Sequence, residues 1–165
     1  MKTIKAKPIT RENFSSYGEI IDMFHPDCWG FGAGTESAFF PDALNLPMGG
    51  GTDPVSVCIC QVKKRENLIT NYEYHNFATE GLLPIDADII IYAGWGFGDI
   101  HSDSLEAFLV PAGTFVKIKP GVLHGTQFVV DKEQATILCE LPGRTFATDF
   151  IGGNFPKEEY LKVEV

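Results

Sequence analysis

The chain has 165 residues, of which 44% are hydrophobic and 21% are charged, so we expect one folded domain with a substantial core and not a disordered segment. The net charge of −9 argues against nucleic acid or an anionic membrane as a partner, because phosphate contacts need clustered lysine and arginine. No apolar stretch approaches the ~18 residues of a membrane span, and no apolar run follows the lysines at the start. We therefore predict a cytoplasmic protein without a signal peptide, acting on a small molecule.

The first third of the chain predicts little regular structure. Thr10 is a suitable N-cap and Gly18 a suitable stop, which together indicate one short helix. A strand is expected over 19–24. The stretch 25–53 is rich in glycine, proline and aromatic residues, so we predict loops there, with short strands near 38–40. Loops of this length in a compact domain tend to be lids or walls of functional sites.

From residue 54 onward, short apolar runs separated by turn residues predict strands at 55–62, 69–76, 81–84, 87–93, 106–110, 114–118, 123–130 and 135–141. Their spacing of roughly eight to twelve residues is typical of an all-β sandwich or barrel. Nothing between them has helical length or period, which excludes alternating βαβ units. We predict a single domain over 1–165, with an N-terminal extension and loops over 1–53, a barrel core over 54–150 and a last helical turn at 157–162.

Cysteines follow the same strand pattern. Cys58 and Cys60 are two residues apart in an apolar run and so share one face of a strand, and Cys139 lies in a similar run. A Cys-x-Cys pair can be a metal or redox element. We interpret these residues as reduced cysteines in the interior, because cysteine is among the most often buried residue types.

Four acid and imidazole side chains are the candidates for a functional site. Glu73 and His75 are two apart, so on a strand they project from the same face. Glu80 follows after a five-residue step that lets the chain turn onto a neighbouring strand, and His124 follows a Pro-Gly turn signal. Imidazole nitrogens and carboxylate oxygens are ligands that divalent transition ions take, with positions left open for substrate.

The order Glu73-x-His75-(x)4-Glu80, followed by Gly113 and later Pro120-Gly121-(x)2-His124, resembles the two sequence motifs of the cupin superfamily. In the usual first motif a histidine stands at the position of Glu73. The resemblance implies an all-β, cupin-type double-stranded β-helix barrel with a short N-terminal helix. It also implies a metal site formed by Glu73, His75, Glu80 and His124, with Mn, Fe, Zn or Ni as the divalent ion.

A narrower resemblance, over most of the chain, is to the ureidoglycolate lyase family, which is built on a cupin-type barrel. It is carried by the opening segment 8–21, by Glu73-x-His75 with the later 82–84 segment Leu-Leu-Pro, and by the run 105–110. The resemblance implies a carbon–nitrogen lyase of purine (allantoin) breakdown that releases urea and glyoxylate from ureidoglycolate. It also implies a homodimer.

The chain departs from that family pattern close to the candidate site. Glu80 stands where the family usually has Gln, Leu123 where it has Trp, and Gly125-Thr126 where it has His-Pro. A carboxylate at position 80 makes a better cage for a cation, and it puts the substrate of the family in question for this chain.

Ureidoglycolate lyase chemistry needs a base for the hydroxyl proton and an acid for the departing nitrogen. We expect His124 or Glu73 to be the base, with His75 and Glu80 holding the ion or the substrate.

The substrate carboxylate needs a cationic partner, for which Lys119, Lys117 and Arg144 are the candidates. Glu140 interrupts an apolar run and falls near an acidic position of the family, so we predict that it faces a polar cavity and binds the substrate, with an edge strand as the alternative explanation.

Two other functions remain open from the sequence. One is a different metal-dependent cupin enzyme, an isomerase or a dioxygenase acting on a small acid or sugar, which the carboxylate of Glu80 would suit. The other is a cupin that binds a small ligand without catalysis, which the missing histidine at position 73 permits.

Overall fold

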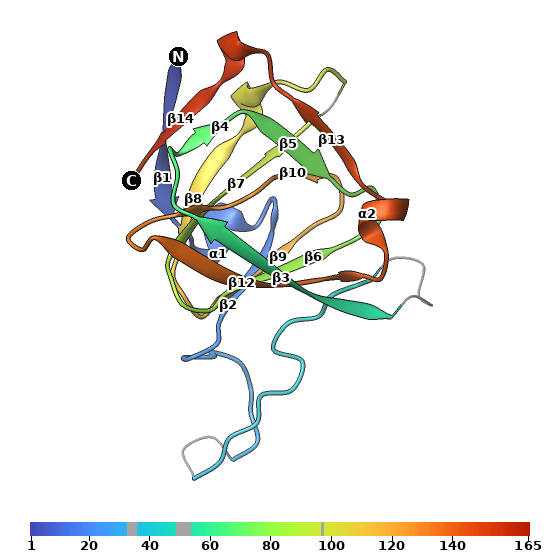
Figure 1. Ribbon diagram of the computed structural model, residues 1–165. Coiled ribbons are helices and arrows are strands. Elements are labelled where there is room, and N and C mark those ends of the chain that lie inside the picture. Colours follow the sequence, from blue (N-terminus) through green and yellow to red (C-terminus); the bar gives the residue numbers. More distant parts are fainter. Residues whose placement is uncertain (33–35, 49–53, 97) are drawn as a thin grey trace.

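The computed structural model describes residues 1–32, 36–48, 54–96 and 98–165 (Figure 1). Parts of the predicted loop region, at 33–35 and 49–53, lie outside the described residues. None of the helices in the described ranges combines the length and the apolarity that a membrane crossing requires.

The described strands form two large sheets and a short ribbon. The larger sheet has the order β10 (Val122–Leu123), β7 (Ile89–Trp95), β8 (Glu106–Val110), β1 (Lys2–Pro8), β14 (Leu161–Glu164) and β4 (Leu68–Ile69), with β11 (Phe128–Val129) also on β7. The smaller sheet has the order β2 (Gly18–Asp22), β9 (Thr114–Ile118), β6 (Glu80–Pro84), β12 (Gln134–Pro142) and β3 (Val55–Lys63). The ribbon pairs β5 (Asn71–Tyr74) with β13 (Ile151–Asn154).

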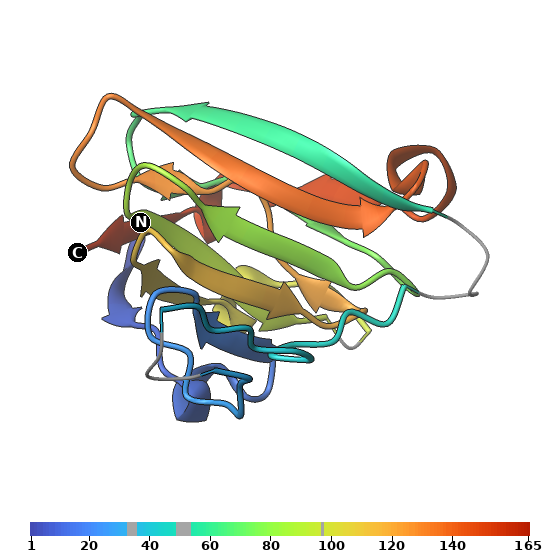
Figure 2. The ribbon, with the colours of Figure 1, turned by 90° about the horizontal axis from the view of Figure 1, so that it is seen from below.

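The two sheets curl around a common core, and Figure 2 shows the smaller sheet running across one side of the barrel. Leu82, Val116 and Ile137 of the smaller sheet pack in one cluster with Ile91 and Phe108 of the larger sheet. Each of these side chains is at most 2% exposed. The predicted all-β, cupin-type barrel is confirmed by this arrangement.

Strand β7 explains why its sequence is apolar without interruption. Ile89 and Ile91 belong to the cluster between the sheets, whereas Ile90 and Tyr92 belong to a second buried cluster. Successive side chains of a strand point to opposite faces. In a strand that is covered on both faces every side chain is therefore buried, which favours apolar residues at all positions.

Most strand predictions are confirmed to within two residues, and β8 and β9 match their predicted ranges. For two of the runs, the prediction of one continuous strand is wrong. The run 69–76 divides into β4 and β5, and the run 123–130 divides into β10 and β11. The second interruption carries His124, and its cause lies in the tertiary contacts of that segment, as described below.

The predicted barrel limits of 54–150 are too narrow. Strand β1 pairs in parallel with both β14 and β8, so the two ends of the chain lie side by side within the larger sheet (Figure 1). The predicted helical turn at 157–162 is only a 3₁₀ turn, η2 (Lys157–Glu159), before β14 begins. Leu161 and Val163 alternate with polar residues and are buried, which fixes this segment as a strand.

The N-terminal helix is shorter than predicted. Helix α1 (Arg11–Phe14) is preceded by Thr10, which forms the predicted N-cap and completes a capping box with Asn13. The helix ends well before Gly18, which instead opens β2. A Cβ atom at Gly18 would lie 1.7 Å from the carbonyl oxygen of Lys117, so the close approach of β2 to β9 requires glycine here.

Beyond β2, the chain leaves the barrel as an extended segment that Figure 1 shows projecting away from the sheets. Among the described residues of this segment, the short strands predicted near 38–40 are represented by a bridge between Phe31 and Phe39. Residues 40–46 return to the outer face of the smaller sheet, where Leu44 and Leu46 line a cavity together with Phe115.

Candidate metal centre and active site

Strand ends bring three of the four predicted side chains together. His75 directly follows β5, Glu80 opens β6, and His124 directly follows β10. The backbones of Glu73 and His124 form an antiparallel bridge, with N–H to O distances of 2.8 and 2.9 Å. This bridge joins the two sequence motifs, which are some fifty residues apart.

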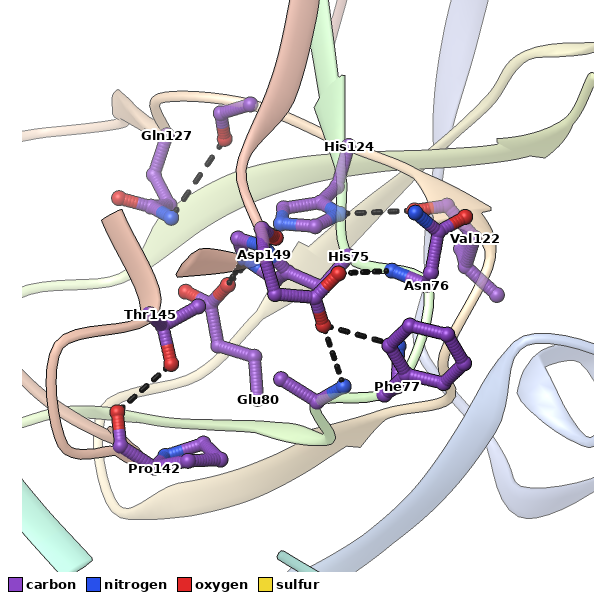
Figure 3. Close-up of polar contacts among 12 residues, drawn as sticks. His75, Asn76, Phe77, Glu80, Val122, His124, Gln127, Pro142, Thr145 and Asp149 are labelled. Atoms are coloured by element: carbon purple, nitrogen blue, oxygen red, sulfur yellow. Dashed lines mark hydrogen bonds and ion pairs between the residues drawn. The ribbon is translucent and has the colours of Figure 1, made fainter. Parts of the chain in front are cut away.

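Glu80 lies between the two histidines (Figure 3). Its Oε2 atom is 3.2 Å from Nε2 of His75 and 2.9 Å from Nε2 of His124. Among the described residues, the His, Cys, Asp and Glu side chains that come close enough to hold a metal ion are these three, whose ligand atoms lie within 4.8 Å of one another. All three are buried, at 2%, 7% and 3% exposure for His75, Glu80 and His124.

Backbone carbonyls fix the tautomers of both rings. Nδ1 of His75 lies 2.7 Å from the carbonyl oxygen of Asp149, and Nδ1 of His124 lies 2.8 Å from that of Val122. A carbonyl oxygen can only accept, so each Nδ1 carries the proton and donates it. In the neutral rings both Nε2 atoms then direct lone pairs at the carboxylate of Glu80.

Three acceptors that converge in a buried space repel one another unless a proton or a cation lies between them. Ring nitrogens that are oriented by a backbone carbonyl at the opposite nitrogen are the usual arrangement of metal-ligating histidines. The donor set of His75, Glu80 and His124 therefore fits a divalent ion.

Charge also couples these groups. Burial by itself would raise the pKa of Glu80, but the charges and hydrogen bonds of His124 and His75 outweigh it and lower the pKa to about 2. Burial disfavours the charged form of His124, yet the charge of Glu80 and the hydrogen bond to it raise the pKa of His124 to about 9. Glu80 is thus held as a carboxylate, the form that binds a cation.

Asp149 is not one of the potential ligands, but its hydrogen bonds hold His75 and the turn that follows it. Its carbonyl oxygen accepts the Nδ1 proton of His75, and its carboxylate accepts hydrogen bonds at 2.8 to 2.9 Å from the backbone N–H groups of Asn76, Phe77 and Ala78 (Figure 3). The turn between His75 and Glu80 is therefore tied to the segment that follows helix α2 (Thr145–Thr148).

A cavity of about 280 Å³ opens beside Glu80. Its walls come mainly from β3 and β12, from β5 and β6, from α2 and from the segment after His124, namely Cys58, Ile59, Cys60, Glu73, Glu80, Thr126, Gln127, Cys139, Leu141 and Phe146. The three cysteines among them are free thiols, as predicted, although they line the cavity and so are not purely core residues.

Glu73 lies in the wall of this cavity but not in the group of potential metal ligands, so the structure assembles three of the four predicted ligands. Burial raises the pKa of the Glu73 carboxyl; His124 and His75 oppose this increase and the charge of Glu80 adds to it. Glu73 is therefore a carboxyl group that takes up a proton more readily than an ordinary glutamate.

Two of the three predicted substrate-binding residues, Lys119 and Glu140, lie away from the cavity beside Glu80. The ammonium of Lys119 donates to the carbonyl oxygens of Ser15 and Ser16 and lines a separate cavity beside α1. Lys117, the other lysine considered, pairs with Glu19 at 2.6 Å.

Glu140 lies on the outer face of the smaller sheet, where it lines the cavity beneath residues 40–46. Its neighbour Cys139 points inward instead. The alternation of side chains along β12 therefore contradicts the prediction that Glu140 faces the substrate.

Arg144 is the predicted cation that lies close to the site. It is exposed and precedes α2 with a left-handed backbone, φ 68°. It lines a small cavity whose walls include Cys58, Leu141 and Phe146, which also line the cavity beside Glu80.

Sequence reasoning missed Asp149, Gln127 and Arg65. The guanidinium of Arg65 donates to the carbonyl oxygens of Thr126 and Gln127 and lies 4.3 Å from the ring centroid of Phe128. No local pattern indicates these roles, since Arg65 and Asp149 contact backbone groups some sixty to seventy residues away along the chain.

The candidate metal centre lies within the part of the chain that resembles a known protein family. The model of the ureidoglycolate lyase family matches residues 1–144, which include His75, Glu80 and His124. A protein of Agrobacterium fabrum, whose name assigns it provisionally as a ureidoglycolate lyase, is 24% identical over 127 residues, covering 75% of this chain and 74% of that protein.

Solved structures share less with the chain. A dTDP sugar isomerase from Desulfovibrio desulfuricans has a TM-score of 0.48 at 14% identity, over 70% of this chain and 73% of that one. RmlC from Streptococcus suis has a TM-score of 0.42 at 10% identity, over 53% of this chain, and the match spans only 43% of that structure. Both scores are low, so the fold assignment depends on the strand pairing described above.

The match to the family model spans most of the chain, and the matched residues include both sequence motifs that supply the potential metal ligands. The family predicted from sequence is thereby confirmed: the chain belongs to the ureidoglycolate lyase family.

Proposed function

We propose that the cavity beside Glu80 cleaves ureidoglycolate into urea and glyoxylate. The observation that carries the proposal is the convergence of His75 and His124 on one buried carboxylate, next to a cavity that also holds the protonatable Glu73, in a member of this family. The family match does not favour a dioxygenase, an isomerase or a non-catalytic ligand binder.

Three residues would hold the divalent ion, namely His75, Glu80 and His124. Two imidazoles and one carboxylate suit Mn, Fe, Zn or Ni better than Mg or Ca, which prefer oxygen ligands throughout. When bound, such an ion supplies a Lewis acid that polarises oxygen atoms of the substrate and acidifies its hydroxyl group.

Glu73 is the proton carrier in our proposal. As a carboxylate it takes the proton of the substrate hydroxyl, the oxygen forms the new carbonyl bond, and the electron pair of the broken C–N bond goes to the departing nitrogen. That nitrogen then needs a proton to leave as urea. The pKa of Glu73 is raised by burial, so the carboxyl both accepts the first proton and is able to deliver it.

Arg144 is the best-placed partner for the substrate carboxylate. Its cavity shares Cys58, Leu141 and Phe146 with the cavity beside Glu80, so a guanidinium at this position can reach its entrance. The planar guanidinium binds a carboxylate through paired hydrogen bonds, which would fix the orientation of the substrate.

Product analysis tests the proposal. Purified protein incubated with ureidoglycolate should release glyoxylate and intact urea in equal amounts, whereas hydrolysis of the ureido group would give ammonia. His124→Ala and Glu80→Ala should abolish turnover while the proteins remain folded by circular dichroism. Wild-type rates in both variants, or glyoxylate release no faster than without protein, would refute the function.

A further inference from the structure

Gln127 is a buried amide in the wall of the cavity and has no role in the mechanism above. Its side chain is 5% exposed and shares the cavity with Glu73 and Glu80. Figure 3 shows it beside His124, on the segment that leaves the histidine.

The carboxamide of Gln127 is weakly engaged within the protein. Its Nε2 atom donates to the carbonyl oxygen of Gly125 at 3.5 Å, at the outer limit for a hydrogen bond, and its Oε1 atom accepts from the Cys60 thiol at 3.9 Å. A primary amide offers two N–H donors and two acceptor lone pairs, so one donor and one lone pair remain for a ligand.

Arg65 fixes the backbone that carries this amide. It donates to the carbonyl oxygen of Gln127 at 2.7 Å and to that of Thr126 at 2.9 Å. The backbone that carries the amide is therefore held in place before a ligand arrives, which lowers the entropy cost of binding.

We propose that Gln127 recognises the terminal carbamoyl group of the substrate through a paired amide–amide contact. This inference rests on the proposed function and identifies the part of the substrate that the Gln127 amide binds. Nε2 of Gln127 donates to the carbamoyl oxygen, and the terminal NH₂ of the ligand donates to Oε1. A carbamoyl NH₂ has an N–H on the same side as its carbonyl oxygen and so completes both bonds at once.

The pairing also gives a reason for selectivity. A ligand with a methyl group in place of the terminal NH₂ keeps the carbonyl acceptor but leaves Oε1 of Gln127 without its donor. Leaving a buried polar group unpaired is more costly than losing an exposed hydrogen bond, so the site rejects the analogue more strongly than size alone would.

Two unreactive ligands test the inference by titration calorimetry with the Mn²⁺-loaded protein. N-carbamoylglycine carries the carboxylate and the carbamoyl group but no hydroxyl, and N-acetylglycine replaces the terminal NH₂ with methyl. We expect the wild type to bind N-carbamoylglycine about tenfold more tightly. Gln127→Met, which retains length without polar atoms, should lose this preference.

Two further variants complete the experiment. Gln127→Glu retains an acceptor and should keep the preference while binding both ligands more weakly, so it remains informative if the methionine variant misfolds. Gln134→Met, the same change at an exposed position of β12, should behave as wild type. Equal affinities in the wild type, or a preference that survives in Gln127→Met, would overturn the inference.

The same measurements separate this inference from the proposed function. Urea release from ureidoglycolate tests the reaction, whereas the affinity ratio of the two ligands tests the amide subsite. Turnover with an unchanged ratio in Gln127→Met would leave the reaction standing and remove the subsite.

Discussion

Replacing Glu80 with glutamine tests whether the buried cluster is a metal centre. The carboxylate is shared between His75 and His124 at 3.2 and 2.9 Å and supplies the only negative charge among the three potential ligands. Glutamine has nearly the same size, so the cavity keeps its shape. It cannot supply an anionic ligand, and its amide group would donate to the imidazole nitrogens and compete with the ion.

The expected effect on stability follows from mass action. At a free metal concentration 100 times the dissociation constant, binding stabilises the wild type by about 2.7 kcal/mol. For a chain of this size each kcal/mol corresponds to about 2–4 °C in melting temperature, so we expect an increase of roughly 5–11 °C. Changes in the surroundings of metal ligands weaken binding about 10- to 100-fold, and a 100-fold loss would leave about 0.4 kcal/mol.

Thermal unfolding of chelator-treated protein with and without Mn²⁺, Zn²⁺ or Ni²⁺ measures this effect. Comparing each variant with and without metal removes the change in stability that Glu80→Gln causes by itself. Glu140→Gln is the matched control, since it makes the same chemical change on the outer face of β12. An equal metal-induced increase in Glu80→Gln and wild type would refute the assignment, as would no increase in the wild type with any of these ions.

Three further predictions follow from the positions of individual side chains. Glu73→Gln should lower kcat for ureidoglycolate by about 10²–10⁴-fold, with the metal-induced increase in melting temperature unchanged. Asp149→Ala removes the acceptor of three backbone N–H groups, so urea denaturation should show about 2–3 kcal/mol less stability, with a smaller loss in Asp149→Asn. Glu140→Gln and Lys119→Met should leave kcat and KM for ureidoglycolate within twofold of wild type, because both residues lie outside the cavity; a tenfold change in steady-state kinetics would contradict this.

The central part of the site was predictable because strand geometry is regular. Glu73 lies in β5 and His75 directly follows it, so their two-residue spacing places both near Glu80, and the Pro-Gly turn marks the approach to His124. The identity of the strands 106–110 and 114–118 followed from the same regularity. Short apolar runs with turn residues between them need little tertiary information.

Substrate-binding residues were harder to predict, because successive residues of a strand face opposite sides of the sheet and the sequence must show which side faces the cavity. Glu140 and Cys139 are neighbours in sequence, yet one faces the outer cavity and the other the inner one. A shift of one residue exchanges the two faces, and the apolar residues around Glu140 do not by themselves say which face is inside. Residues of the N-terminal extension, among them Leu44 and Leu46, line the cavity that Glu140 faces on the outer side of β12.

The break between β10 and β11 shows why the remaining features were not predictable. The run 123–130 has the composition of one strand, but a Cβ atom at Gly125 would lie 1.9 Å from the hydroxyl oxygen of Tyr92. That hydroxyl donates to the carbonyl oxygen of Asn71, at the start of the strand that carries Glu73. The chain therefore leaves the sheet after His124, and the carbonyl groups released from strand pairing are bound by Arg65 instead. A tertiary contact thus interrupts the strand directly after His124, and the apolar composition of the run 123–130 does not predict that interruption.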